Sequence, residues 1–151
     1  MQQSSRRGSA VALLELGIAL TRLIRAQVVR SRAAGLTLVE FRALSAVDAA
    51  PGLPLKELAL LMGLTPATVS RLAERLVRRG LLRRRPDAGD RRRALFRLTR
   101  KGAGVLTAAR RDIEIMLDAR LEGLSGAELA ELRHISHLLL PLLASDRASD
   151  S

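Results

Sequence analysis

Arginine is the residue type whose number and spacing in this sequence point most clearly to a chemistry. The stretch RRRPDAGDRRR, residues 83–93, places three arginines on either side of a five-residue spacer. Residues 71–101 hold twelve Arg and one Lys against Glu74, Asp87 and Asp90, so thirteen positive and three negative charges put +10 of the chain's net +11 in this segment. A localised basic field is typical of polyanion binders, which release about one counterion for each phosphate neutralised. The alternative is a solvated arginine-rich surface without a partner.

Residues suited to covalent or metal chemistry are scarce. The chain has no cysteine and two histidines, and it contains no glycine-rich phosphate loop, so a nucleophile and a base are hard to assemble. His134 and His137 lie three residues apart and could share a helix face as metal ligands, but the sequence offers no clear third ligand. We therefore expect ordinary surface or interface histidines, and a protein that is not an enzyme and uses no metal or cofactor.

Length and composition favour one mainly α domain. The 151 residues are 48% hydrophobic but include only two Phe and no Tyr or Trp. Leucine and alanine must therefore fill the core, as they do most readily between packed helices. No uncharged run of 18 residues occurs, so we expect no membrane span, and the absence of cysteine is compatible with a cytoplasmic location.

Residues 54–80 predict two short helices joined by a tight turn. Gly63 permits the turn, and Thr65 with Pro66 supplies an N-cap and a first-turn proline for the second helix. This is the helix-turn-helix pattern, although an ordinary helical hairpin with a polar face is the alternative. The exposed side of the second helix combines small residues, hydroxyls and arginines, which suit close approach to a major groove. We expect major-groove contacts from Thr65, Pro66, Ala67, Thr68, Ser70, Arg71 and Arg75.

The arginine-rich stretch itself predicts a β-hairpin rather than a basic coil. After Gly80, Ala94, Phe96 and Leu98 alternate with other residues at the period of two that a strand requires. The spacer supplies proline, aspartate and glycine, which favour a turn. We expect the arginines beside this hairpin to contact the phosphate backbone; they are Arg78, Arg84, Arg85 and Arg93.

Long amphipathic helices flank this reading head, which we define as residues 37–99. Apolar residues at three- and four-residue steps predict a helix within 10–34 and two helices within 101–144. The polar ends, 1–9 and 145–151, are expected to be loose tails. Because the flanking helices carry more apolar surface than the reading head needs, we expect them to form a homodimer whose two reading helices address half-sites one turn apart. Packing within one chain is the alternative.

Two capping boxes mark where further helices begin. Thr37 and Glu40 stand three residues apart ahead of an apolar run, and Ser125 and Glu128 repeat the spacing.

The order helix, helix-turn-helix, hairpin and two long helices, over about residues 11–144, resembles the multiple antibiotic resistance regulator (MarR) family of winged-helix transcription factors. The most specific pieces are LTPATVSRL and the triplet Asp90-Arg91-Arg92 ahead of Leu98-Thr99. The chain departs from the family at Leu53-Pro54, where a capping hydroxyl would be expected, and in its shortage of aromatic residues.

The resemblance implies a mainly α winged helix-turn-helix protein with N- and C-terminal dimerisation helices. It implies a homodimeric regulator of a pseudo-palindromic operator, with a recognition helix in the major groove and a wing in the minor groove. It also implies that Asp90 orients Arg92, beside Arg91, toward the minor groove, whose narrow A·T-rich form attracts such a guanidinium. A surface ion pair of little consequence is the alternative for Asp90.

The predicted function is that of a transcriptional repressor whose binding to DNA is relieved by a small-molecule effector. An architectural DNA binder without sequence preference and an RNA binder remain alternatives. RNA modules commonly stack bases on aromatic side chains, and the basic region has only Phe96, which the alternation places inward.

Overall fold

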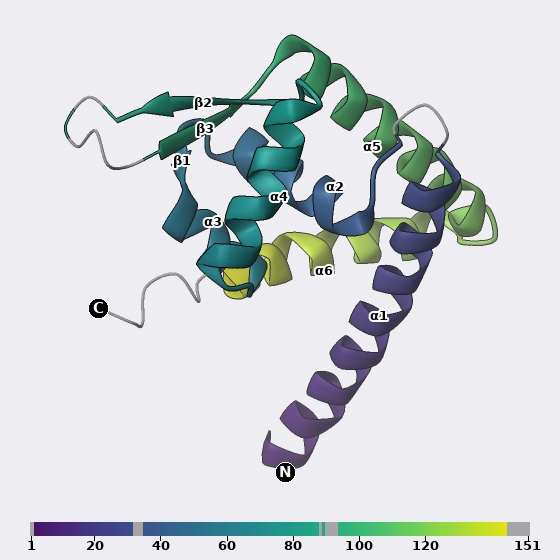
Figure 1. Ribbon diagram of the computed structural model, residues 1–151. Helices are drawn as coiled ribbons and strands as arrows, with labels where there is room; N and C mark the ends of the chain where they lie inside the picture. Colours follow the sequence, from purple (N-terminus) through teal and green to yellow (C-terminus); the bar gives the residue numbers. More distant parts are fainter. Residues whose placement is uncertain (1, 32–34, 88, 90–93, 145–151) are drawn as a thin grey trace. The chain divides into compact units, whose positions relative to one another are not determined.

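The computed structural model describes residues 2–31, 35–87, 89 and 94–144 (Figure 1). The chain is mainly helical with one small antiparallel sheet, which confirms the fold class predicted from the sequence. It divides into two compact units, Met1–Glu114 and Ile115–Ser151. The elements in order are α1 (Gln2–Arg30), α2 (Leu38–Ala49), β1 (Leu53–Pro54), α3 (Leu55–Met62), α4 (Pro66–Arg78), β2 (Leu82–Pro86), β3 (Ala94–Leu98), α5 (Arg100–Leu121) and α6 (Gly126–Ala144).

The first helix begins earlier than the sequence predicted. We expected residues 1–9 to be a loose tail, but α1 starts at Gln2, and the Ser9 Oγ donates a hydrogen bond to the Ser5 carbonyl one turn back. The segment contains no proline, and extending an existing helix costs far less than nucleating one. The polar composition that indicated a tail is thus compatible with a helix continued from its apolar neighbour.

The helix-turn-helix forms as predicted. α3 ends at Gly63, whose φ of 63° lies in the left-handed region that glycine adopts without strain. The Thr65 Oγ1 accepts a hydrogen bond from the Thr68 backbone N–H, so α4 has the N-cap that the sequence indicated, with Pro66 in its first turn. The buried stripe of α4 packs in the core and consists of Val69, Leu72, Ala73 and Leu76.

The hairpin is present and has a third strand that the sequence did not reveal. β2 and β3 pair antiparallel with Arg84 opposite Phe96, and Phe96 is buried as its alternation predicted. β1 pairs with the other edge of β3, which gives the strand order β1-β3-β2. Two residues are too few to show alternation, so Leu53-Pro54 looked like a weak helix cap; Pro54 makes no side-chain cap and serves as a strand residue instead.

A threonine and a glycine join the start of α5 to the turn that follows α4. The Thr99 Oγ1 donates to the Gly80 carbonyl at 2.6 Å and accepts from the Gly102 N–H at 2.9 Å. A Cβ on Gly102 would lie 2.0 Å from the Leu81 carbonyl oxygen, so only glycine fits there. The Lys101 ammonium donates to the Arg79 carbonyl at the C-terminal end of α4, where the helix dipole favours a cation. The joint fixes the base of the hairpin against the helix-turn-helix.

The terminal helices expose many of their apolar side chains. In α1 these are Val11, Leu14, Leu16, Ile18, Leu20 and Val29, and in α6 they are Leu132, Ile135, Leu138, Leu140, Leu142 and Leu143. In the second unit, the Glu128 carboxylate accepts from the Ser125 N–H and its own N–H donates to the Ser125 Oγ, so the predicted capping box is present. None of the helices described is both long enough and apolar enough to cross a bilayer.

Candidate nucleic-acid interface

The N-terminal half of α4 presents short polar side chains to solvent. Thr65, Pro66, Ala67 and Thr68 are all exposed, and the Thr65 and Thr68 hydroxyls lie 2.9 Å apart. Arg71 is also exposed and has no ion pair within the described part of the chain. Short side chains let the backbone approach another surface closely, while the hydroxyls and the guanidinium supply donors. The structure thus brings these five predicted residues together on one open face.

Ser70 differs from the other predicted residues because it has an internal partner. It is half-buried, and its Oγ donates to the Glu74 Oε1 at 3.3 Å, one turn further along α4. Glu74 is exposed and is the acidic residue that interrupts the basic side of this helix.

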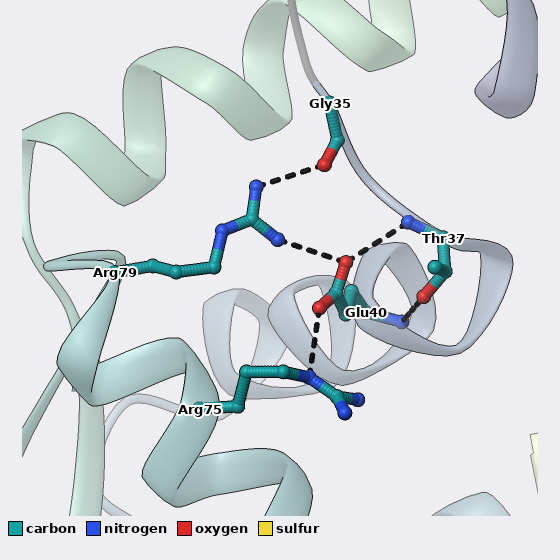
Figure 2. Close-up of polar contacts among 5 residues, drawn as sticks. All are labelled: Gly35, Thr37, Glu40, Arg75 and Arg79. Carbon is teal, nitrogen blue, oxygen red and sulfur yellow. Dashed lines mark hydrogen bonds and ion pairs between the residues drawn. The ribbon is translucent and has the colours of Figure 1, made fainter.

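Arg75 also has an internal partner, and the sequence did not indicate it. Its Nε donates to the Glu40 Oε1 at 3.1 Å, from α4 to α2 across 35 residues of sequence (Figure 2). The arginine side chain is 53% exposed, whereas that of Glu40 is 5% exposed. Arg75 was predicted to reach the major groove, and the structure shows that one edge of its guanidinium is already held by the protein.

Glu40 is the centre of a small polar cluster that joins three segments. Its Oε2 accepts from the Thr37 N–H at 3.0 Å, completing the predicted capping box, and from the Arg79 Nη1 at 2.9 Å. The Arg79 Nη2 donates in turn to the Gly35 carbonyl at 2.8 Å. Figure 2 shows the two arginines approaching the carboxylate from α4 and from the turn after it.

The pKa of Glu40 shows which influence prevails in this cluster. Burial raises the pKa, but the hydrogen bonds from Thr37 and Arg79 and the positive charges of Arg79 and Arg75 outweigh it and hold the value below the ordinary 4.5. Glu40 is therefore ionised at neutral pH. A buried carboxylate without a cationic partner would be costly, so burial of Glu40 implies an arginine or lysine beside it. The sequence does not show that burial, and it therefore gave no sign of the two arginine partners.

The hairpin is lined with arginines on its described strands. Arg83, Arg84 and Arg85 are all exposed on β2, which continues from the end of α4 in Figure 1. Arg83 pairs in register with Arg97 on β3, so two like charges stand directly opposite each other. Such pairs destabilise a hairpin on their own. An external anion would offset that repulsion.

Four of the predicted site residues lie outside the described residues. They are Asp90, Arg91, Arg92 and Arg93, which follow β2 and precede β3 in the sequence. The pairing of Asp90 with Arg92 therefore stays a prediction. Arg78, predicted to contact phosphates, is exposed at the C-terminal end of α4.

A hollow of about 340 Å³ lies between α4 and the hairpin. Ser70, Glu74 and Arg78 line it from α4, and Arg84 and Phe96 line it from the strands. Its lining combines apolar surface with two guanidinium groups, so both predicted DNA-contacting elements contribute to one cavity. Among the residues described, no three His, Cys, Asp or Glu side chains group as metal ligands, and His134 and His137 are exposed on α6.

Comparisons with known proteins agree with this architecture. A protein-family model described as the MarR family matches residues 34–93, a range that includes α2, the helix-turn-helix and β2. A MarR-family protein from Bacillus stearothermophilus has a similar structure, with a TM-score of 0.81 at 21% identity over 96% of this chain and 99% of that one. RV1404 from Mycobacterium tuberculosis gives a TM-score of 0.79 at 23% identity, covering 96% of this chain and 98% of its own. The search of curated proteins gave no significant match.

A third solved structure is more similar in sequence. The PcaV transcriptional regulator from Streptomyces coelicolor, determined in complex with its natural ligand, is 31% identical over 76% of this chain and 77% of its own, with a TM-score of 0.53. The helix-turn-helix and the three-stranded sheet define a winged helix-turn-helix protein. The chain belongs to the MarR family of transcriptional regulators.

Proposed function

We propose that this protein is a sequence-specific regulator of transcription that binds duplex DNA with α4 in the major groove and the hairpin wing in the adjacent minor groove. The observation that carries the proposal is the open face of α4, where a capped N-terminus presents short polar residues and Arg71 beside an arginine-lined hairpin. Short side chains and a guanidinium fork suit the base edges, while a dense basic field suits the phosphates.

The contacts divide into those that specify the sequence and those that position the protein. Base contacts come from the first turns of α4, at Thr65, Pro66, Ala67 and Thr68, and from Ser70, Arg71 and Arg75 in the turns that follow. Backbone contacts come from Arg78, Arg84, Arg85 and Arg93, whose charges bind phosphates and position the protein without reading a base. At the wing tip, Asp90 orients Arg92 into the minor groove, with Arg91 beside it.

The active form is a homodimer on a pseudo-palindromic operator. The exposed apolar side chains of α1 and of α6 support this, because a monomer would leave both sets in water. A dimer that covers a promoter excludes other proteins from it, so the simplest outcome of binding is repression.

A small-molecule effector would relieve this repression. PcaV was solved with its natural ligand, which supports a ligand-responsive regulator. The hollow between α4 and the wing is lined by residues of both DNA-contacting elements, so a molecule bound there would compete with DNA. An effector could also favour a spacing of the two reading heads that does not fit the operator.

Footprinting on DNA upstream of the protein's own gene tests the proposal. We expect one discrete protected site with two-fold symmetry, whereas uniform protection would indicate an architectural DNA binder. Affinities for duplex DNA, single-stranded DNA and structured RNA should be compared at one salt concentration, because phosphate contacts make each of them salt-dependent. A preference for duplex DNA below about tenfold would contradict the proposal and favour an RNA or single-strand binder.

A further inference from the structure

Two arginines share the Glu40 carboxylate, but they use it differently. Both Nη groups of Arg79 donate hydrogen bonds within the protein, one to Glu40 and one to the Gly35 carbonyl. Arg75 donates to Glu40 through its Nε, and within the described part of the chain its Nη groups have no hydrogen-bond partner. Figure 2 shows the Nη end of Arg75 turned away from the carboxylate. Arg79 is thus a structural link between α2 and α4, whereas Arg75 keeps a free donor edge.

The free edge of Arg75 stands on the side of α4 that carries Arg71. The two arginines are four residues apart, so they lie one above the other on the helix surface. An arginine in solution samples many rotamers, and each rotamer-rich side chain that binding immobilises costs about 0.5–1.5 kcal/mol. A guanidinium already fixed at Nε avoids part of that cost and presents its two Nη groups in one plane.

We propose that Glu40 is a positioning residue for DNA recognition: from inside the reading head it holds Arg75 in the orientation that contacts the operator, and so contributes to sequence specificity without touching DNA. The inference rests on the proposed function, because it assigns a role within the same DNA interface. Glu40 also offsets the charge of Arg75. An Arg75 released from Glu40 would still reach phosphates, but it would do so on any sequence.

The experiment compares Glu40→Gln with the wild-type protein on operator DNA and on a scrambled duplex, over a range of salt concentrations. The amide oxygen of glutamine can still accept the Thr37 N–H, so the capping box is retained. We expect the ratio of operator to scrambled affinity to fall about three- to tenfold. Affinity for the scrambled duplex should rise, and its dependence on log salt should steepen by up to about 0.9, because one more cation is free to bind phosphate.

Two matched variants separate positioning from charge and from stability. Asp48→Asn removes the same charge from the same helix, α2, where the carboxylate pairs with Arg110 rather than with a proposed DNA contact, and should leave the affinity ratio unchanged. Arg79→Gln removes the structural partner of the same carboxylate and should lower the melting temperature while Arg75 keeps its Nε contact and the ratio is retained. A fall in the ratio with Asp48→Asn as large as with Glu40→Gln would overturn the inference.

A double-mutant cycle asks whether Glu40 acts through Arg75. In an Arg75→Gln background, Glu40→Gln should produce no further change in the affinity ratio; a full additional loss would overturn the inference. If Glu40→Gln does not fold, Arg75→Lys is tested in its place. Lysine keeps the positive charge, but its single ammonium group cannot bind Glu40 through one edge and DNA through another, as a guanidinium can. An unchanged ratio for Arg75→Lys would then contradict the role. A wild type without operator preference would overturn the proposed function and this inference together, whereas a specific wild type with an equally specific Glu40→Gln variant would overturn the inference alone.

Discussion

The reading head and the terminal helices use the same residue type in opposite ways. Leu76 in α4 is 0% exposed, whereas Leu140 in α6 is 64% exposed. Leucine side chains in the head therefore stabilise the fold because they are removed from water by packing within one chain. The exposed leucines of α1 and α6 can contribute such stabilisation only when another surface covers them. In the proposed homodimer, the stability of the head would be a property of one chain, whereas that of the terminal helices would depend on the partner chain.

The largest expected effect comes from making one substitution in each region. Leu76→Ala should lower the free energy of unfolding by about 2–5 kcal/mol, because it leaves a cavity among buried side chains. Leu140→Ala removes the same atoms from an exposed site, so its cost should depend on protein concentration and vanish when the protein is diluted to the monomer. Thermal unfolding at two concentrations, with the mass determined by sedimentation, measures both. An equal, concentration-independent loss for the two variants would break the comparison.

The two capping boxes extend the comparison to charge. Glu40 in the head is buried. Burial raises its pKa, but Thr37 and the two arginines lower it by more, so the pKa lies below its ordinary value. Glu128 in α6 is exposed, and its pKa is lowered by hydrogen bonds from Ser125 alone. The same four-residue pattern therefore caps a helix in both places, but among the residues described only the Glu40 box also joins two helices.

Stability measured against pH should separate the two boxes. Because folding lowers both pKa values, each carboxylate contributes fully above the ordinary 4.5 and loses that contribution as the pH falls through its folded pKa. The melting temperature of Glu40→Gln should consequently fall less than that of the wild type between about pH 5 and pH 3. Glu128→Gln should differ little from the wild type, because solvent screens an exposed group. A larger effect at Glu128 than at Glu40 would show that burial of the carboxylate is not what matters.

The sequence could predict those parts of the fold and site that depend on nearby residues. Thr65 with Pro66, the two capping boxes, the turn at Gly63 and the alternation around Phe96 are all local signals, and the structure confirms them. Contacts between distant segments left no such signal.

The ion pair between Arg75 and Glu40 spans 35 residues, and β1 exists only because β3 lies beside it. A periodic pattern cannot reveal either, since both depend on how the helices and strands pack. Burial of a carboxylate, rather than its spacing, is what distinguishes Glu40 from Glu128.

The smallest expected effect concerns an arginine of the hairpin whose charge favours DNA binding but destabilises the fold. Arg83 stands opposite Arg97 on the hairpin, so Arg83→Thr removes a like-charge repulsion and supplies a residue with a high β propensity. We expect the free energy of unfolding to rise by about 0.2–1 kcal/mol. The same variant removes one positive charge from the basic field, so it should bind all duplex sequences more weakly and reduce the salt slope by up to about 0.9. Denaturant titration and binding isotherms at several salt concentrations measure the two effects, and Arg42→Thr, on α2 and bonded to the Met62 carbonyl, is the control for removing one arginine elsewhere. A stability gain with unchanged DNA affinity would mean that Arg83 lies outside the interface and that the basic field of the head is smaller than its arginine count implies.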